Sequence, residues 1–173
     1  NGMVCTLDAS TGASHRVAAS GLGEITSLSW TSARTEDGET LEMLAVGSRE
    51  KRVSVWAFED GKLIATHALH LPKPNATLSE AQRGRVWVAV SWAEPFEDES
   101  ACRLISSGQG GELLSWKVPL NFGEGVVDVN EAKAFGPRSV AHARTVFTVI
   151  TAEDKCWSTS LDRKVACWDL DTH

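Results

Sequence analysis

The sequence lacks long apolar runs, and no stretch approaches the roughly 18 to 20 apolar residues that a membrane-spanning helix needs. The first residues, Asn1-Gly2-Met3-Val4-Cys5, also lack the charged start and the continuous apolar segment of a secretory signal. We therefore expect a soluble protein with no membrane partner.

Cysteine is scarce, and its spacing does not suggest a disulfide framework or a metal site. No CxxC pair occurs among Cys5, Cys102, Cys156 and Cys167. All four lie in apolar segments, which suits buried and reduced thiols and favours an intracellular compartment. The glycosylation triplet Asn75-Ala76-Thr77 is then interpreted as a chance occurrence.

Basic residues are in deficit, with 17 Lys and Arg against 23 Asp and Glu and a net charge of −6. Acidic stretches occur at residues 35–39 and 97–99. The whole chain therefore does not present the basic field of a nonspecific nucleic-acid binder, and any contact with RNA must be local.

Catalytic motifs are lacking too. The sequence has no nucleophile elbow, no phosphate loop and no His/Glu metal helix. His67 and His70 are three residues apart, which places them on opposite faces of a strand rather than together on a metal. The glycine-rich run at 107–111 precedes a predicted strand, so no helix N-terminus follows it that could hold a phosphate. We interpret the run as a turn. We expect no enzyme, no metal, no cofactor and no small-molecule substrate.

The sequence does contain a repeat. A short strand ending in small residues, a polar turn and a second strand recur, and the second strand closes on Leu7, Trp56, Trp116 and Trp168. Alternating β-branched and aromatic residues predict strands near residues 24–30, 43–48, 51–57, 62–70, 85–92, 103–108, 112–117, 144–150, 156–160 and 164–169.

Four strands per repeat predict an all-β fold of the WD40 type, with about three antiparallel four-stranded blades of a seven-bladed β-propeller. The predicted boundaries are a part-blade at 1–20, blades at 21–70 and 84–135, and a part-blade at 143–173. Three blades cannot close a ring, so we expect a fragment of a larger propeller.

The turns between the repeated strands share one position, six residues before the closing Trp. It holds Glu50, Gly110 and Asp162, and an Asp there can accept hydrogen bonds from its own turn. No Gly-His pair opens any repeat. We therefore expect the Asp-His-Ser-Trp hydrogen-bond network of WD repeats to be incomplete and packing to supply more of the stability.

Trp87 is the candidate for a binding surface. The neighbouring Trp92 has a core counterpart in Trp30, whereas the positions equivalent to Trp87 hold Ile25 and Val146. Arginines at Arg85, Arg144 and Arg163 lie at similar strand ends and turns. An aromatic platform with arginines suits single-stranded nucleic acid, because bases stack on rings and guanidinium groups contact phosphates. The alternative is that Trp87 packs between blades and that the arginines are solvated.

Several segments resemble the WD-repeat proteins of the Gemin family. The resemblance rests on Arg85-Val86-Trp87, on Gly110-Gly111-Glu112-Leu113-Leu114-Ser115-Trp116 and on Asp162-Arg163-Lys164-Val165-Ala166-Cys167-Trp168-Asp169. It implies part of the first of two N-terminal propellers that form an RNA-binding module. Proteins of this kind belong to the survival-of-motor-neuron (SMN) complex and deliver small nuclear RNA for Sm-ring assembly.

The resemblance also implies particular residue roles. The RNA-stacking Trp of the family matches Trp87, and two RNA-contacting arginines match Arg144 and Arg163, with Arg85 beside them. The expected partners are then small nuclear RNA, recognised at its Sm site, and SMN complex proteins, in the cytoplasm and in nuclear gems. Contacts to the RNA cap are expected outside this chain. The rival hypothesis is a protein-binding WD scaffold with no direct RNA contact.

Overall fold

Every regular element of the computed structural model is a β-strand within the residues it describes, which are 2–18, 23–35, 37–72, 87–94, 101–122, 126–129, 132–136 and 141–172. The same ranges contain no helix long and apolar enough to span a membrane. The strands are β1 Met3–Leu7, β2 Ser14–Ala18, β3 Ile25–Arg34, β4 Thr40–Ser48, β5 Arg52–Glu59, β6 Lys62–Leu69, β7 Val90–Trp92, β8 Ala101–Ser107, β9 Leu113–Pro119, β10 Val126–Val129, β11 Ala132–Ala134, β12 Val146–Ala152, β13 Lys155–Ser160 and β14 Val165–Asp169.

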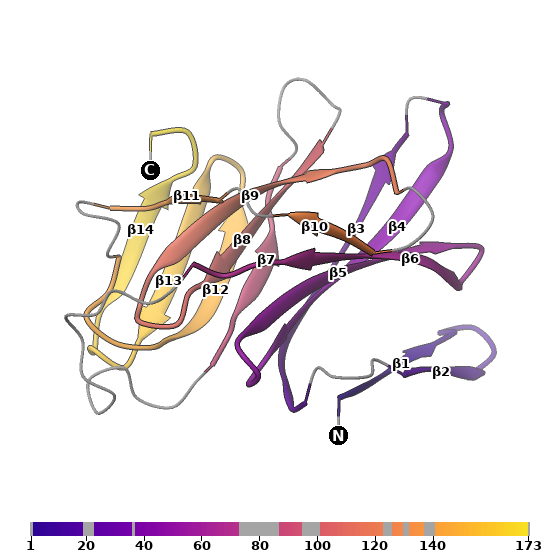
Figure 1. Cartoon of the computed structure of the whole chain (residues 1–173), viewed down its shortest axis with the longest axis horizontal. Helices are drawn as coiled ribbons and strands as arrows, with labels where there is room; N and C mark the ends of the chain where they lie inside the picture. Colours follow the sequence, from indigo (N-terminus) through magenta and orange to yellow (C-terminus); the bar gives the residue numbers. More distant parts are fainter. Residues whose placement is uncertain are drawn as a thin grey trace.

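The strands form separate antiparallel sheets that follow the predicted repeat. One sheet has the order β6-β5-β4-β3, the next has β11-β9-β8-β7, and the last described sheet has β12-β13-β14, while β1 and β2 form an N-terminal hairpin. We call the β6-β5-β4-β3 sheet blade 1, the β11-β9-β8-β7 sheet blade 2 and the β12-β13-β14 sheet blade 3. Figure 1 shows blade 2 between blade 3 (yellow and orange) and blade 1 (purple). The fold is that of WD40-type propeller blades, as predicted.

The predicted strands are confirmed with small changes in their ends. The largest difference is at 85–92, where the regular strand is restricted to Val90–Trp92 and the first two predicted residues lie outside the described ranges. Register places Trp30 opposite Leu44 and Trp92 opposite Leu104, so the two tryptophans do share a repeat position.

Three observed strands, β2, β10 and β11, have no predicted range, and β10 also departs from the repeat. Val126–Val129, in the connection after blade 2, pairs in parallel with residues 66–69 at the outer edge of blade 1. Blade 1 therefore has a fifth strand, β10, donated from a segment that has no counterpart in the other repeats. An unpaired outer strand exposes a row of backbone N–H and C=O groups, and β10 satisfies those of β6.

The core lies between the blades because alternate residues of each strand face opposite neighbours. Leu104 faces blade 1 in one apolar cluster, while the adjacent Ile105 faces blade 3 in a second cluster. Polar groups also join the inner strands: the Trp92 indole N–H donates to the carbonyl oxygen of Ser29 at 3.0 Å, and the hydroxyls of Ser91 and Thr151 are 2.9 Å apart.

The expectation that Trp30 is a core residue like Trp92 was wrong. Trp92 is 8% exposed because it packs against blade 1, whereas Trp30 is 46% exposed. Trp30 lies on the opposite face of blade 1, where its ring contacts Phe58 of the same blade with centroids 5.3 Å apart. Equivalent sequence positions thus differ in burial because only one of them has a blade in front of it.

Candidate nucleic-acid interface

The antiparallel order brings two kinds of segment to one end of the blades. These are the residues just before each inner strand (β3, β7 and β12) and the turns β4–β5, β8–β9 and β13–β14. We call this end, which lies at the bottom of Figure 1, the upper rim. Trp87 precedes β7, Arg144 precedes β12 and Arg163 lies in the β13–β14 turn, so all three are at the upper rim. Arg85 lies outside the described residues.

The three turns of the upper rim share a positive φ at the same position, which fits their prediction as equivalent turns. The residue after Glu50, Gly110 or Asp162 adopts a left-handed conformation in every case, with φ of 59° at Lys51, 101° at Gly111 and 68° at Arg163. Such conformations are uncommon outside glycine, so their recurrence identifies one turn type kept across the blades.

Trp87 lies between blades 1 and 3 and is half-buried. The Phe147 ring of blade 3 meets it edge-on, with centroids 6.1 Å apart and planes at 79°. The Cζ atom of Arg49, in blade 1, is 6.0 Å from the ring centroid of Trp87. The indole also packs against the apolar cluster between blades 2 and 3. Trp87 therefore contributes to packing between blades and presents only part of its ring to the rim.

The indole N–H of Trp87 is buried and has no hydrogen-bond acceptor among the described residues. A buried donor without an acceptor costs about 1 to 3 kcal/mol, so such groups are uncommon in folded proteins. Trp92 and Trp116 donate instead to Ser29 O and to Ser106 Oγ. Trp87 thus differs from these core tryptophans in its hydrogen bonding.

Arg49 is a rim residue that the sequence reasoning missed. It is half-exposed and pairs with Glu24 at 2.9 Å, where the side chains are 39% and 59% exposed. An ion pair that is this exposed is worth less than about 1 kcal/mol, so it can exchange for another anion. The only available signal was the position of Arg49 in the turn equivalent to residues 161–163, and a turn arginine on its own is usually a solvated charge.

Arg144 and Arg163 are exposed, and neither forms an ion pair with the described residues. The backbone of Arg144 is fixed because its carbonyl accepts a hydrogen bond from Ser160 Oγ at 3.0 Å. The next carbonyl, that of Thr145, accepts one from Leu161 N–H at 2.9 Å. The segment that bears Arg144 is therefore held against the turn that bears Arg163.

A complete Asp-His-Ser-Trp network holds this part of the rim, which corrects the expectation of an incomplete one. His142 Nδ1 is 3.0 Å from Asp162 Oδ2 and His142 Nε2 is 2.7 Å from Ser158 Oγ, which also accepts the Trp168 indole N–H at 3.0 Å. The histidine follows Ala141 where a Gly-His pair was sought, so the motif search missed it.

Asp162 is the anionic end of that network. Burial alone would raise the pKa of this carboxyl, but the Ala143 and Lys164 N–H groups and the His142 ring donate hydrogen bonds that together hold its pKa below the ordinary value. The bond from Lys164 confirms that Asp162 caps its own turn, and the bond from Ala143 joins that turn to the preceding segment. The arrangement fixes backbone position and leaves no free catalytic base here.

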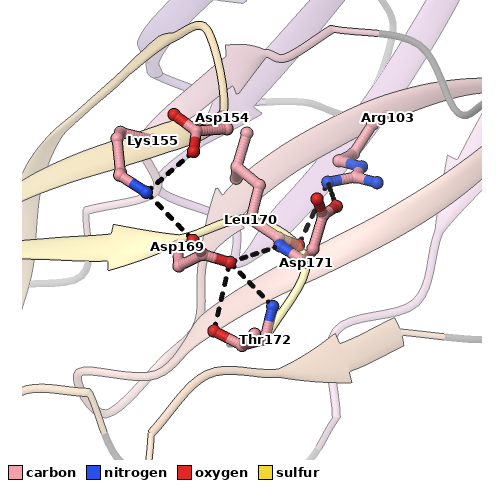
Figure 2. Close-up of polar contacts among 7 residues, drawn as sticks. All are labelled: Arg103, Asp154, Lys155, Asp169, Leu170, Asp171 and Thr172. Carbon is pink, nitrogen blue, oxygen red and sulfur yellow. Dashed lines mark hydrogen bonds and ion pairs between the residues drawn. The ribbon is translucent and has the colours of Figure 1, made fainter.

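The Trp168-Asp169 dipeptide closes blade 3 at the opposite end, which we call the lower rim (Figure 2). Asp169 accepts N–H hydrogen bonds from Thr172 at 2.9 Å and Asp171 at 3.1 Å, and it pairs with Lys155 at 2.9 Å. Hydrogen bonds to the carboxylate, the strongest from the Thr172 N–H and the next from Lys155, hold the pKa of Asp169 well below its usual range. Arg103 of blade 2 reaches Leu170 O and Asp171, both at 3.0 Å, and so joins blades 2 and 3.

The cysteines only partly match the expectation of core thiols. Cys102 and Cys156 are buried, and burial raises their pKa values to about 11 and about 12, so both stay protonated at neutral pH. Cys5 and Cys167 are exposed, because they lie on outward-facing positions of β1 and β14. No group of three or more His, Cys, Asp or Glu side chains in the described ranges could hold a metal ion.

No family model matches the chain. Among solved structures, the WD40 β-propeller domain of Doa1 has a TM-score of 0.48 at 14% identity. The match covers 85% of this chain and 38% of the Doa1 chain. The computationally designed Ika4 protein has a TM-score of 0.46 at 12% identity, and the match covers 86% of this chain and 92% of the Ika4 chain.

Two curated relatives are similar in sequence. The chain is 29% identical to human Gem-associated protein 5 and 27% identical to the mouse protein of the same name, each over 135 residues and 75% of this chain. The match spans 8% of the length of either relative. The Gemin resemblance inferred from the motifs is therefore supported by similarity over three quarters of the chain, and the chain is a WD-type propeller segment similar to Gem-associated protein 5.

Proposed function

We propose that the upper rim binds single-stranded RNA, with Trp87 as a base-stacking platform and Arg144, Arg163 and Arg85 as contacts to phosphates or base edges. Similarity to Gem-associated protein 5 supports small nuclear RNA, bound near its Sm site, as the ligand. It likewise supports SMN complex proteins as partners in snRNP assembly, in the cytoplasm and nuclear gems. The function is binding, without a catalytic step.

The single observation on which the proposal rests is the environment of Trp87. Its indole N–H is buried without an acceptor, and its half-buried ring lies at the same rim as two exposed arginines that no described carboxylate neutralises. A base can stack on the part of such a ring that faces the rim, and cations at the rim suit its phosphates. A binding site for RNA at this rim is compatible with the net charge of −6 because the cations are local.

The test is RNA affinity as a function of salt. Trp87→Ala should weaken binding of an Sm-site-like single strand by about 1 to 3 kcal/mol, the usual value of one base on one ring. Arg144→Ala and Arg163→Ala should weaken it too. Each lost phosphate contact should lower the slope of log affinity against log salt by about 0.7, whereas loss of a base-edge contact should relax sequence preference instead.

Two controls separate binding from folding. Lys133→Ala removes an exposed cation from β11 and should leave RNA affinity unchanged. Trp92→Ala should unfold the blades because Trp92 is buried between them. If Trp87→Ala unfolds the protein as Trp92→Ala does, or leaves RNA affinity intact, Trp87 is a packing residue and a protein-binding scaffold becomes the better hypothesis.

A further inference from the structure

A groove of about 610 Å³ lies at the lower rim between blades 1 and 2, away from Trp87 and the rim arginines. Three segments line it: the β3–β4 hairpin, the β5–β6 hairpin and the residues that follow β9. Its volume is in the range of sites that hold a small ligand or a few residues of a peptide.

The rim of the groove is acidic. Asp37, Glu39 and Glu59 line it, all three are exposed, and none forms an ion pair with the described residues. No Lys or Arg is among the described residues that line the groove. Asp37 and Glu39 belong to the acidic stretch seen in the sequence, and the fold brings Glu59 from another hairpin beside them. Uncompensated carboxylates around a concavity concentrate negative potential, which attracts cations and repels RNA.

The floor of the groove is apolar and fixed. Leu120 and Phe122 pack against the apolar cluster between blades 1 and 2 that contains Leu104, and the Phe122 N–H donates to Leu120 O at 3.1 Å. The Phe122 ring lies on buried His67, with centroids 4.0 Å apart. Ile64 adds an apolar wall that is 45% exposed. A site that is already ordered does not have to lose conformational entropy when it binds.

We propose that this groove binds a basic peptide segment of a protein partner, with one bulky apolar side chain on the Leu120 and Phe122 floor and flanking arginines on Asp37, Glu39 and Glu59. Arginine suits this rim because its planar fork contacts carboxylates with two hydrogen bonds. A second copy of this chain is a poor occupant, since its net charge is also −6. Because the groove and the Trp87 site are at opposite rims, one ligand does not block the other.

The probe is a fluorescein-labelled peptide, Gly-Arg-Arg-Leu-Arg-Arg-Gly, with binding to the full chain measured by fluorescence anisotropy. Two companion peptides replace Leu by Gly or every Arg by Glu. The Leu peptide should bind most tightly and lose affinity as salt rises. Equal binding of the Gly peptide would overturn the proposal, since it would mean adsorption by charge alone.

Variants of the protein then locate the site. The triple variant Asp37→Asn, Glu39→Gln, Glu59→Gln should weaken binding about tenfold or more, because each exposed charge pair accounts for about two- to fivefold. The matched control removes the same charge elsewhere with Glu42→Gln, Glu94→Gln and Glu153→Gln, all exposed, and should bind like wild type. Ile64→Ser should weaken the Leu peptide more than the Gly peptide.

Three further results would overturn the proposal. Equal affinity of the two triple variants would show that binding is not local to the groove. Loss of peptide binding in Trp87→Ala, which is at the other rim, would place the peptide there instead. Sedimentation that shows a dimer in wild type and a monomer in Ile64→Ser would identify a second copy as the occupant. Circular dichroism of each variant checks that the fold is intact.

Discussion

The two upper-rim turns of blades 2 and 3 occupy the same place in their blades and are stabilised by different chemistry. In blade 3, the Asp162 side chain accepts hydrogen bonds from its own turn, from Ala143 and from His142. In blade 2, Gly110 has no side chain, and the Glu112 carboxylate accepts the Gly110 N–H at 2.6 Å instead. One turn is stabilised by a buried side-chain network and the other by a carboxylate two residues further on.

The difference follows from what lies against each turn. The blade 2 turn is in direct contact with the entry segment of blade 3, and the His142 N–H donates to Gly111 O at 3.0 Å. A Cβ atom at Gly111 would collide with the carbonyl oxygens of His142 and Arg144. Glycine is needed at position 111 because another backbone approaches closely there.

The largest effect is expected from filling that space. Gly111→Ala should cost about 3 kcal/mol or more in unfolding free energy, because the new methyl group meets two backbone carbonyls at a positive φ. Gly61→Ala is the matched control: its φ is 73°, but nothing lies within 4 Å of the added Cβ, so only about 1 kcal/mol of backbone strain is expected. Urea unfolding measures both, and equal losses would show that the close approach is unimportant.

The next effect concerns the side-chain network of blade 3. Asp162→Ala should cost about 2 kcal/mol or more, because it removes three hydrogen bonds and leaves His142, which is buried, without one of its partners. Asp154→Ala, at an exposed turn residue of the same blade, provides the comparison in thermal unfolding. A melting temperature that is unchanged by Asp162→Ala would contradict the capping role.

A smaller contrast separates the two serines that accept indole hydrogen bonds. The Ser158 hydroxyl forms hydrogen bonds with both Trp168 and His142, whereas the Ser106 hydroxyl accepts one from Trp116. Ser158→Ala should therefore cost about 2 kcal/mol and Ser106→Ala about 1 kcal/mol, because two buried groups lose a partner in one case and one group does in the other. Chemical denaturation of the two variants side by side tests this order, and a reversed order would refute it.

The smallest effect is a dependence on pH. The folded-state pKa of Asp162 lies below its ordinary value, so its charged form contributes stability that is complete above the unfolded pKa of about 4 and is lost as pH falls through the folded value. The stability difference between wild type and Asp162→Asn should accordingly shrink as pH falls below about 4. A difference that stays constant from pH 6 to pH 3 would mean that this carboxyl does not titrate with folding.

The repeat made the blades predictable, because strand alternation and the Trp116 and Trp168 positions are local properties of the sequence. The network at His142 was missed since Ala141 stands where glycine was sought. The exposure of Trp30 depends on which blade lies in front of it, and no local pattern encodes that. Arg49 was missed because its approach to Trp87 joins residues from different blades.

The strand β10 could not be predicted either, since the segment at 118–143 has no counterpart in the other repeats. For the binding site, sequence gave candidates that the fold places at one rim, namely Trp87, Arg144 and Arg163. Their role in binding RNA remains a prediction, and Arg85 lies outside the described residues.

The pairing of β10 with β6 changes how the molecule can open. Repeat proteins normally unfold in steps, since each repeat contacts only its nearest neighbours. Here residues 126–129, which follow blade 2, hydrogen-bond the far edge of blade 1. Blade 2 cannot detach from blade 1 without also releasing that edge, so we expect the amides of β6 and β9 to exchange with solvent in one cooperative event. Among the described residues, no strand of another blade pairs with β14, so its amides should exchange sooner.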